Sequence, residues 1–325
     1  PYDVFSPDGA RTAYFARLGN KWMVVVDGTE GRQYEGFEEY CLAFSTDSQR
    51  LAYTAYQGNK FIVVTDGVEG KQYDSFGTMS TIFSPNSKRL AYIASQGNKW
   101  FVVVEGIEGE RYDGIKGGDR YLTGKYRSSL VFSPDSRRLA YPAQIGNRWL
   151  VVVDGTEERQ YEDIKGYSLV FSPDSRRLAY AAQIGNKWTV VVDGTEGKQY
   201  EDIDEYSLVF SPDSKILAYT ARSGSGWVAV IGGTEKQYDK FGTRQVNFSP
   251  DSKHVAYSAQ IGGKHLVIVD GTEGKQYDDV GYVTFSPDSK RLVYGAKQGN
   301  KYFVVVDGIE LSLIHISEPT RQAEI

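Results

Sequence analysis

Short apolar segments alternate with turn-forming residues along almost the whole chain, and the alternation repeats. In one representative unit the apolar segments are 168–172, 177–183, 187–193 and 198–203. Each is short enough to be a β-strand, and 168–172 and 187–193 combine valine with an aromatic residue. No segment shows the 3.6-residue periodicity of a helix. The pattern therefore predicts a unit of four short strands.

This unit recurs eight times. A period near 40 residues with four strands per repeat is typical of the blades of a β-propeller. We expect an all-β chain, a β-propeller of eight four-stranded antiparallel blades over residues 1–310. The last blade is expected to be incomplete, lacking its outer strand, which a strand upstream of Pro1 would supply in a closed ring; seven blades plus an extra repeat is the alternative. The Phe-Ser-Pro-Asp phrase that anchors each unit is spaced by 39, 39, 49, 39, 39, 38 and 37 residues and begins at Phe5, Phe44, Phe83, Phe132, Phe171, Phe210, Phe248 and Phe285. The expected blades are 1–38, 39–77, 78–115, 128–165, 166–204, 205–242, 243–280 and 281–310.

The residues between the strands favour antiparallel turns. Ser172-Pro173-Asp174-Ser175 places proline at the second position of a type I turn, with an aspartate able to bond nearby backbone. Gly185-Asn186 supplies the positive φ of a tight hairpin. The segment 193–197 (Asp-Gly-Thr-Glu-Gly) predicts a longer reversal. Each unit is therefore expected to be an up-and-down meander.

The third strand carries a continuous Val-Val-Val run, which predicts that both faces of each sheet are buried between neighbouring blades. An aromatic residue opens this strand in most units, and a tyrosine recurs in the second strand of all eight. Residues shared by every unit are expected to pack blade against blade. Pro142 stands inside a second strand without a donor for the ladder, so a β-bulge is predicted there.

The core FSPDS-x-RLAY, followed by KW-x-VVVDG, resembles the TolB-type, WD40-like (PD40) propeller repeat of bacterial proteins over residues 1–310. The Gly-His and Trp-Asp dipeptides of eukaryotic WD40 blades are missing. The resemblance implies a propeller with interaction or scaffolding roles, often in the periplasm or outside the cell. It implies no catalytic residue.

An insert distinguishes the fourth unit from the others. The spacing of 49 instead of 39 residues reflects ten extra residues within the segment 116–127 (KGGDRYLTGKYR). We expect this insert to join an outer strand to the next inner strand and to overhang the face that carries the Gly-Asn hairpins. Its four basic residues and two tyrosines suit an anionic or polar partner; a surface insertion without a role is the alternative. The candidate ligand-binding residues here are Arg120, Tyr121, Lys125, Tyr126 and Arg127.

A second candidate surface is the mouth of the expected central channel, because the residues that enter the innermost strands vary between blades. Tyrosine combines contact area with a polar tip, which suits peptides and glycans, while closure of the channel by bulky side chains is the alternative. A basic residue beside the Gly-Asn hairpin also recurs in seven blades, as a cationic rim or, more commonly, as solvated turn flanks. The candidate residues at the mouth are Tyr40, Tyr167, Tyr206, Arg244 and Tyr282.

Composition narrows the function further. The net charge of −5, from 37 basic and 42 acidic residues mixed along the chain, gives no footprint for nucleic acid or an anionic membrane. Apolar runs fall far short of the roughly 20 residues of a membrane helix. Nucleophile-elbow, zinc-protease and phosphate-loop motifs are absent, and one cysteine with three scattered histidines cannot assemble a zinc site. We expect no enzyme activity, no cofactor, no metal, no nucleic-acid partner and no membrane insertion.

These observations favour a monomeric, non-enzymatic interaction or scaffold propeller that binds a protein, peptide or glycan on the face bearing the insert and the channel mouth. The alternative is the N-terminal propeller of a prolyl-oligopeptidase-like serine peptidase whose catalytic domain would follow residue 310. Residues 311–325 (LSLIHISEPTRQAEI) leave the repeat abruptly and resemble one reading frame of a sequencing adapter. We therefore expect this tail to be non-native.

Overall fold

The chain is an all-β protein of eight antiparallel blades, the β-propeller fold. The computed structural model describes residues 4–312 apart from 39–40, 78–79, 118, 121–125 and 242–245, and the side chains of 119, 120, 126, 127 and 312 are also outside the description. No helix occurs among these residues, and hence none that could cross a membrane. Eight sheets correspond to the eight predicted repeats, and one further small hairpin lies within the fourth.

The second and third strands form the longest hairpin of every blade. The second strands are β2 (Thr12–Leu18), β7 (Leu51–Gln57), β12 (Leu90–Gln96), β19 (Leu139–Ile145), β24 (Leu178–Ile184), β29 (Leu217–Ser223), β34 (Val255–Ile261) and β38 (Leu292–Gln298). The third strands are β3 (Lys21–Val26), β8 (Lys60–Thr65), β13 (Lys99–Val104), β20 (Arg148–Val153), β25 (Lys187–Val192), β30 (Gly226–Ile231), β35 (Lys264–Val269) and β39 (Lys301–Val306).

The outer and inner strands flank this hairpin. The fourth strands are β4 (Thr29–Glu30), β9 (Val68–Tyr73), β14 (Ile107–Glu108), β21 (Thr156–Glu157), β26 (Thr195–Tyr200), β31 (Thr234–Tyr238), β36 (Thr272–Glu273) and β40 (Ile309–Ser312). In six blades the first strand consists of two segments that pair with the same second strand: β5 (Gly36–Phe37) and β6 (Ala43–Phe44), β10 (Ser75–Phe76) and β11 (Ile82–Phe83), β15 (Gly114–Ile115) and β18 (Val131–Phe132), β22 (Asp163–Ile164) and β23 (Val170–Phe171), β27 (Asp202–Ile203) and β28 (Val209–Phe210), β32 (Lys240–Phe241) and β33 (Asn247–Phe248). The first and last blades use the single segments β1 (Val4–Phe5) and β37 (Asp279–Phe285).

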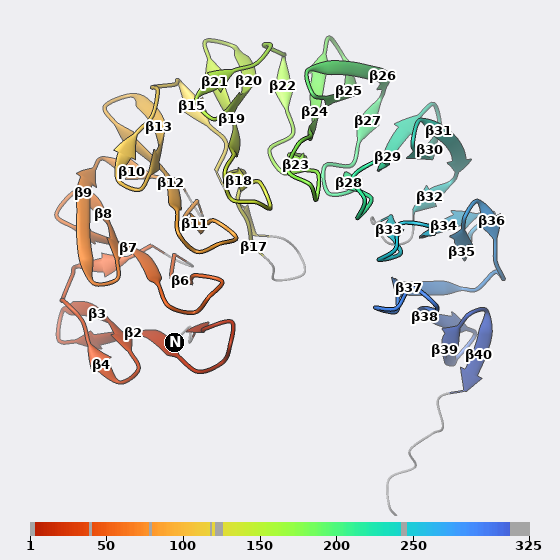
Figure 1. Ribbon diagram of the computed structural model, residues 1–325, viewed down its shortest axis with the longest axis horizontal. Helices are drawn as coiled ribbons and strands as arrows, with labels where there is room; N and C mark the ends of the chain where they lie inside the picture. Colours follow the sequence, from red (N-terminus) through yellow and green to blue (C-terminus); the bar gives the residue numbers. More distant parts are fainter. Residues whose placement is uncertain are drawn as a thin grey trace, which may run out of the picture. The chain divides into compact units, whose positions relative to one another are not determined.

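Two compact units divide the chain. Unit 1 is Pro1–Gln199 and holds the first five blades, and unit 2 is Tyr200–Ile325 and holds the last three, with the boundary at the final residue of β26. Within unit 1, successive blades lie side by side, and the first strands β6, β11, β18 and β23 lie on the same inner side (Figure 1).

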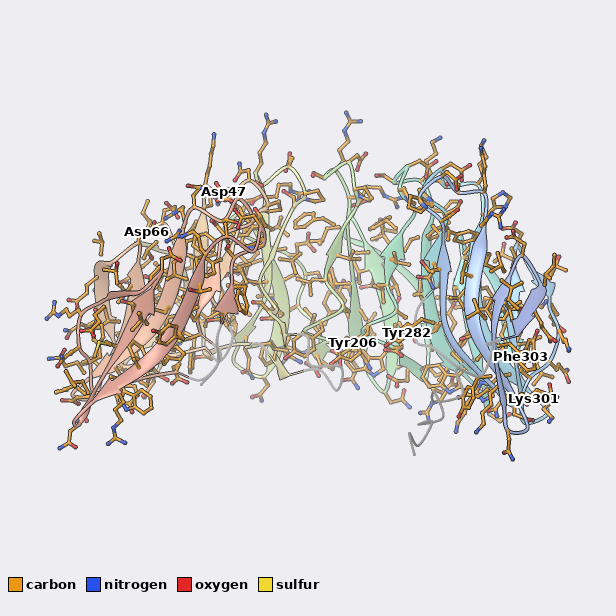
Figure 2. All side chains as sticks on the ribbon, turned by 90° about the horizontal axis from the view of Figure 1, so that it is seen from below. Asp47, Asp66, Tyr206, Tyr282, Lys301 and Phe303 are labelled. Atoms are coloured by element: carbon orange, nitrogen blue, oxygen red, sulfur yellow. The ribbon has the colours of Figure 1, made fainter. Side chains whose placement is uncertain are left out.

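The turns place different chemistry at the two ends of each blade. The Ser-Pro-Asp turn and the Asp-Gly turn lie at one end, which we call the Ser-Pro-Asp edge; Figure 2 shows Asp47 and Asp66 there in blade 2. The Gly-Asn hairpins lie at the other end, the Gly-Asn edge. The predicted type I turn is confirmed, because Ser175 N–H donates to Ser172 O over 2.8 Å.

Both hairpin connections are two-residue turns. In Gly185-Asn186 only the glycine has a positive φ, 62°, as a type II′ turn requires. Asp193 and Gly194 have φ of 51° and 77°, the pattern of type I′. The predicted longer reversal over 193–197 is therefore wrong, because β26 already begins at Thr195.

The predicted fourth strand is also displaced. The segment 198–203 divides between two blades: β26 ends at Tyr200, whereas Asp202–Ile203 forms β27 and pairs with β29 of the next blade. The final blade contains a fourth strand, because β40 pairs with β39 from Val306↔Ile309 to Phe303↔Ser312. The expectation of an incomplete last blade is therefore wrong, and its outer strand includes Leu311 and Ser312 from the expected tail.

The core lies between neighbouring blades, as the valine runs predict. Val151 and Val152 point to opposite faces of β20 and are both fully buried. Val152 packs with Ile93 and Tyr112 of blade 3, whereas Val151 packs with Tyr161 and residues of blade 5. The prediction that the recurring tyrosines serve packing is confirmed: Tyr73 and Tyr92 of adjacent blades meet edge to face with centroids 6.2 Å apart.

Candidate functional site

Three of the residues predicted at the channel mouth, Tyr167, Tyr206 and Tyr282, lie in bulges of the first strands. In blade 5, Ile164 pairs with Ala182 and Val170 with Ala179, so the first strand advances six residues while the second advances three. The intervening loop, residues 165–169, protrudes opposite the middle of β24. These first-strand bulges vary in sequence from blade to blade, whereas the strands around them repeat.

The insert is an enlarged first-strand bulge. Residues 116–130 lie between β15 and β18, which both pair with β19, so the insert interrupts an inner strand and does not precede one. The backbone of β16 (Asp119–Arg120) pairs with that of β17 (Tyr126–Arg127) as a small hairpin. Removing 118–127 would leave Lys-Gly-Ser-Ser-Leu-Val, the length of Lys-Gly-Tyr-Ser-Leu-Val in blade 5. The ten extra residues are therefore 118–127.

The base of the insert is fixed to the neighbouring blade. Lys116 Nζ forms an ion pair with Asp163 Oδ1 over 2.7 Å and lies 4.8 Å from the centroid of the Trp149 ring. Tyr167 Oη donates to Gly117 O over 3.3 Å. Of the predicted site residues, Tyr167 thus contacts the insert directly, and it lies half-buried in the bulge of blade 5.

Two other predicted tyrosines belong to unit 2. Tyr282 is 70% exposed and lies at the bulge of β37, where the register shifts between Val280 and Val283. Tyr206 is half-buried, and its N–H donates to Asp204 Oδ1 over 3.1 Å. Figure 2 shows both tyrosines toward the edge at which Lys301 opens β39, the Gly-Asn edge. Tyr40, Tyr121, Lys125 and Arg244, and the side chains of Arg120, Tyr126 and Arg127, lie outside the described residues.

A serine closes the backbone of the bulges in blades 3, 5 and 6. Ser168 Oγ accepts the N–H of Ala181 over 2.8 Å, and Ser80 and Ser207 do the same for Ile93 and Thr220. In blade 4 the equivalent donor position is Pro142, which has no N–H, and Ser129 Oγ donates instead to Lys116 O. Pro142 stays in regular register with Val151, so the bulge predicted at this residue is wrong. The proline is tolerated because it faces the interrupted first strand.

The single cysteine takes the position of this serine in blade 2. Cys41 is 6% exposed, and its Sγ donates to Thr54 O over 3.3 Å. Burial raises the pKa of the thiol to about 12. The thiolate needed for nucleophilic chemistry is therefore disfavoured, and Cys41 is a packing residue.

Most basic residues beside the Gly-Asn hairpins form ion pairs with acids of their own blade. Lys99 pairs with Asp113 over 2.6 Å and Arg148 with Glu162 over 2.6 Å, and Lys60 and Asp74 also form a pair. The second oxygen of the acid accepts the N–H of the next hairpin glycine, for example Gly146 to Asp113 over 2.7 Å. These side chains connect adjacent blades and do not form a free cationic rim.

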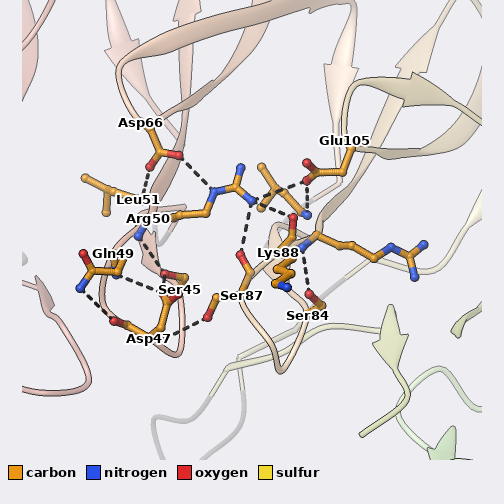
Figure 3. Close-up of polar contacts among 12 residues, drawn as sticks. Ser45, Asp47, Gln49, Arg50, Leu51, Asp66, Ser84, Ser87, Lys88 and Glu105 are labelled. Carbon is orange, nitrogen blue, oxygen red and sulfur yellow. Dashed lines mark hydrogen bonds and ion pairs between the residues drawn. The ribbon is translucent and has the colours of Figure 1, made fainter. Parts of the chain in front are cut away.

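In each of blades 1 to 4, an arginine binds the next blade at the Ser-Pro-Asp edge, a contact that we call the arginine clamp (Figure 3). Arg50 Nε bonds to Asp66 Oδ2 over 3.1 Å, and Nη1 donates to Lys88 O over 3.1 Å and Ser87 O over 3.4 Å. Its Cζ lies 5.2 Å from the centroid of the Phe83 ring. Arg11, Arg89 and Arg138 repeat the contact with the carbonyls and the ring at their own junctions.

Sequence reasoning missed this arginine clamp, although a signal exists. The arginine is followed 16 residues later by the acid of the Asp-Gly turn, as in Arg50 and Asp66. Where the arginine is replaced by Ile216, the acid is replaced by Gly232, so both partners are lost together. A second link runs parallel to the clamp, because Asp47 N–H donates to Ser87 Oγ over 2.9 Å.

The described residues contain no group of three or more His, Cys, Asp or Glu side chains arranged to hold a metal ion. The perturbed groups lie instead in the interblade contacts: burial, for instance, raises the pKa of Tyr112 to about 12. The first-strand bulges thus remain the candidate binding surfaces, whereas a structural network occupies most of the repeated charged residues.

No family model and no curated protein matches this chain. Among solved structures, a eukaryotic initiation factor is 13% identical with a TM-score of 0.55, and the match covers 95% of this chain and 86% of that one. This likeness concerns the fold alone. TolB from Acinetobacter baumannii (13% identity, TM-score 0.37, covering 81% and 78%) and the β-propeller domain of the Trilobed protease from Pyrococcus furiosus (14%, 0.39, 89% and 100%) also match, too weakly to carry an argument.

Proposed function

We propose that this chain is a non-enzymatic interaction domain that binds a protein, peptide or glycan through its first-strand bulges, with the insert at 116–127 as a principal contact. The observation that carries the proposal is that the repeated residues and the variable residues lie in different places. The repeated tyrosines, arginines and hairpin bases are occupied in interblade contacts, whereas the bulges differ between blades and present tyrosine. Function on a repeat fold is expected where the repeats differ.

The anchoring of the insert supports this proposal. Tyr167 and Lys116 connect its base to blade 5 through the bond to Gly117 O and the ion pair with Asp163. The contact of Lys116 with Trp149 recurs in blade 5 as Lys165 with Trp188, so the bond from Tyr167 is the contact particular to this loop. Holding a contact loop by its base lowers the conformational entropy lost on binding. The exposed aromatic ring of Tyr282 adds the kind of side chain that is enriched at interfaces.

We further propose that the repeats belong to the TolB-type, WD40-like class of bacterial proteins, because they carry the motifs FSPDS-x-RLAY and KW-x-VVVDG.

The test is a binding screen with matched variants. The full chain is applied to glycan and peptide arrays, and each hit is measured again with a variant lacking 118–127, whose bulge then has the length of that in blade 5. A parallel pair compares Tyr282→Ser with Tyr302→Ser, another exposed tyrosine of the same blade, 61% exposed, which is the second residue of β39 and lies outside any bulge. Loss of binding in the deletion variant or Tyr282→Ser, with Tyr302→Ser unchanged, is expected. Binding that is unchanged in both bulge variants overturns the proposal.

The serine-peptidase alternative is tested by the gene. A reading frame that continues from residue 310 into a domain with a nucleophile elbow would overturn the non-enzymatic assignment of the whole protein. A stop codon soon after the last blade would instead support the non-enzymatic assignment.

A further inference from the structure

The junction between blades 7 and 8 lacks the arginine that fills the corresponding place in unit 1. His254 occupies the arginine position, and its Nδ1 lies 2.7 Å from Asp270 Oδ2, the carboxylate equivalent to Asp66 at the Arg50 clamp. The imidazole stacks on Phe285 with centroids 6.4 Å apart and planes at 27°. Histidine thus reproduces the part of the clamp made by Nε and the ring.

The rest of the clamp is left without a donor. At the Arg50 junction, Nη1 donates to the carbonyls of Ser87 and Lys88. The equivalent carbonyls belong to Ser289 and Lys290, and neither accepts a hydrogen bond from any residue within the described part of the chain. Imidazole is shorter than an arginine side chain and cannot reach them.

A cavity lies where the guanidinium would be. It has a volume of about 390 Å³, within the range of small-molecule sites. Its lining combines the two carbonyl-bearing residues with the ring of Phe285, His254 and the apolar side chains of Val267 and Leu292. The lining therefore offers what Arg50 finds at its own junction: backbone acceptors and an aromatic face.

Charge in the cavity is mixed. Asp307 contributes a carboxylate, while Glu273 is paired with Lys236 over 3.1 Å and Lys275 with Glu310 over 2.6 Å. Lys290 and Arg291 carry positive charge at the rim. Screening by water weakens the repulsion from such exposed side chains, so directed hydrogen bonds and ring contact decide what binds.

We propose that this cavity is a guanidinium site, which takes the side chain of an arginine, either as a free amino-acid derivative or within a peptide. The bound guanidinium would donate to Ser289 O and Lys290 O and lie near the face of Phe285, as Arg50 does within the chain. A planar fork with several donors suits two adjacent carbonyls better than a single ammonium does. The site is at the Ser-Pro-Asp edge, apart from the first-strand bulges, and is independent of the proposed function.

The test measures binding of L-arginine amide to the full chain by calorimetry or by chemical-shift changes, with L-lysine amide and L-citrulline as probes of charge and of shape. Arginine amide is expected to bind at least roughly tenfold more tightly than either. The variant His254→Arg supplies the missing guanidinium from the chain itself, so it should abolish binding and raise Tm. Ile216→Arg, at a junction where Gly232 removes the acid, is the control that should leave binding unchanged.

Several results would overturn the proposal: no binding of arginine amide, equal binding of lysine amide, or binding that persists in His254→Arg. The comparison of arginine amide with lysine amide uses the unaltered chain, so it decides the question even if the variant fails to fold. A Gly-Arg-Gly peptide distinguishes the source. Tighter binding of the peptide points to a partner chain and tighter binding of arginine amide to a free ligand, and both outcomes support the guanidinium site.

Discussion

The bulge serines show how one hydroxyl stabilises an irregular strand. Ser168 Oγ accepts the N–H of Ala181 and donates to Lys165 O over 2.7 Å, so it satisfies two backbone groups that the interrupted ladder leaves unpaired. Ser129 makes a single bond, to Lys116 O, because Pro142 offers no N–H. Equivalent positions in the repeat therefore differ in what they contribute to stability.

This difference predicts unequal costs for the same substitution. Ser168→Ala should lower the free energy of unfolding by about 1–3 kcal/mol, because a buried N–H loses its acceptor. Ser129→Ala should cost less, since only a carbonyl loses a donor. Urea unfolding of the two variants checks the prediction, which fails if Ser129→Ala is the more damaging change.

The arginine clamp depends on the shape of the guanidinium as well as on its charge. Arg50→Lys keeps the charge but cannot bond to Asp66 and to the carbonyls of blade 3 together, so we expect a loss of about 1–2 kcal/mol. Arg137→Lys is the matched control, because its side chain is 87% exposed and pairs only with Asp135 of its own turn. Equal urea midpoints for the two variants would contradict an interblade role for Arg50.

At the scale of elements, the Asp-Gly turns set the register between third and fourth strands. Gly271 has a φ of 80° and open space where a Cβ would lie, so any cost of a side chain there comes from the backbone alone. Gly295, in the second strand of blade 8, also has open space but an ordinary φ. Because a Cβ would meet no atom at either site, substitutions at the two glycines isolate the cost of the left-handed backbone conformation at Gly271.

We expect Gly271→Ala to destabilise the chain by roughly 1–2 kcal/mol, the cost of the left-handed conformation for a residue with a Cβ. Gly295→Ala should be neutral or slightly stabilising, because it restricts the unfolded chain without strain in the folded one. Thermal unfolding monitored by circular dichroism measures both. A larger loss in Gly295→Ala would show that strain at the turn is not the controlling factor.

At the scale of the molecule, stability depends on many equivalent ionisable groups. The pKa of Asp47 lies below its usual value because of the hydrogen bond from the Ser45 hydroxyl first and the Gln49 N–H second. Asp8, Asp135, Asp213, Asp251 and Asp288 are lowered by the equivalent bonds. The folded state therefore favours the ionised carboxylates. Their contribution is fully present above the unfolded pKa of about 3.9 and is lost as the pH falls through the folded values.

We therefore expect the urea midpoint to fall steeply below about pH 4 and to stay level above it until the buried tyrosines titrate. Burial raises the pKa of Tyr112 to about 12, so the folded state favours its neutral form, and stability declines again above about pH 10. Asp47→Asn should reduce the acid slope without disturbing the turn, because Asn86 makes the same contacts with Ser84 and Lys88 in blade 3. A midpoint that is constant down to pH 2 would contradict this account.

The sequence by itself determined the eight repeats, the strand order and the type I turn at Ser172, because these depend on periods of two and of about 40 residues and on the local preferences of proline and glycine. It also determined that the valine runs and recurring tyrosines would be buried. Its errors at 193–197, 198–203 and the last outer strand concern where strands begin and end, and those at Pro142 and at the insert concern where a strand is interrupted. Pairing between strands decides both.

Only the tertiary structure decided the rest. The first-strand bulges, the neutralised hairpin bases and the arginine clamp depend on partners that strand pairing and blade packing bring together: Arg50 meets Lys88 O across 38 residues, and Tyr167 meets Gly117 O across 50. The cavity at His254 is an extreme case, because nothing in the sequence around His254 distinguishes it from the other repeats. The cavity arises because the neighbouring blade places Ser289 and Lys290 beside His254, at positions whose carbonyls bind an arginine at the Arg50 junction.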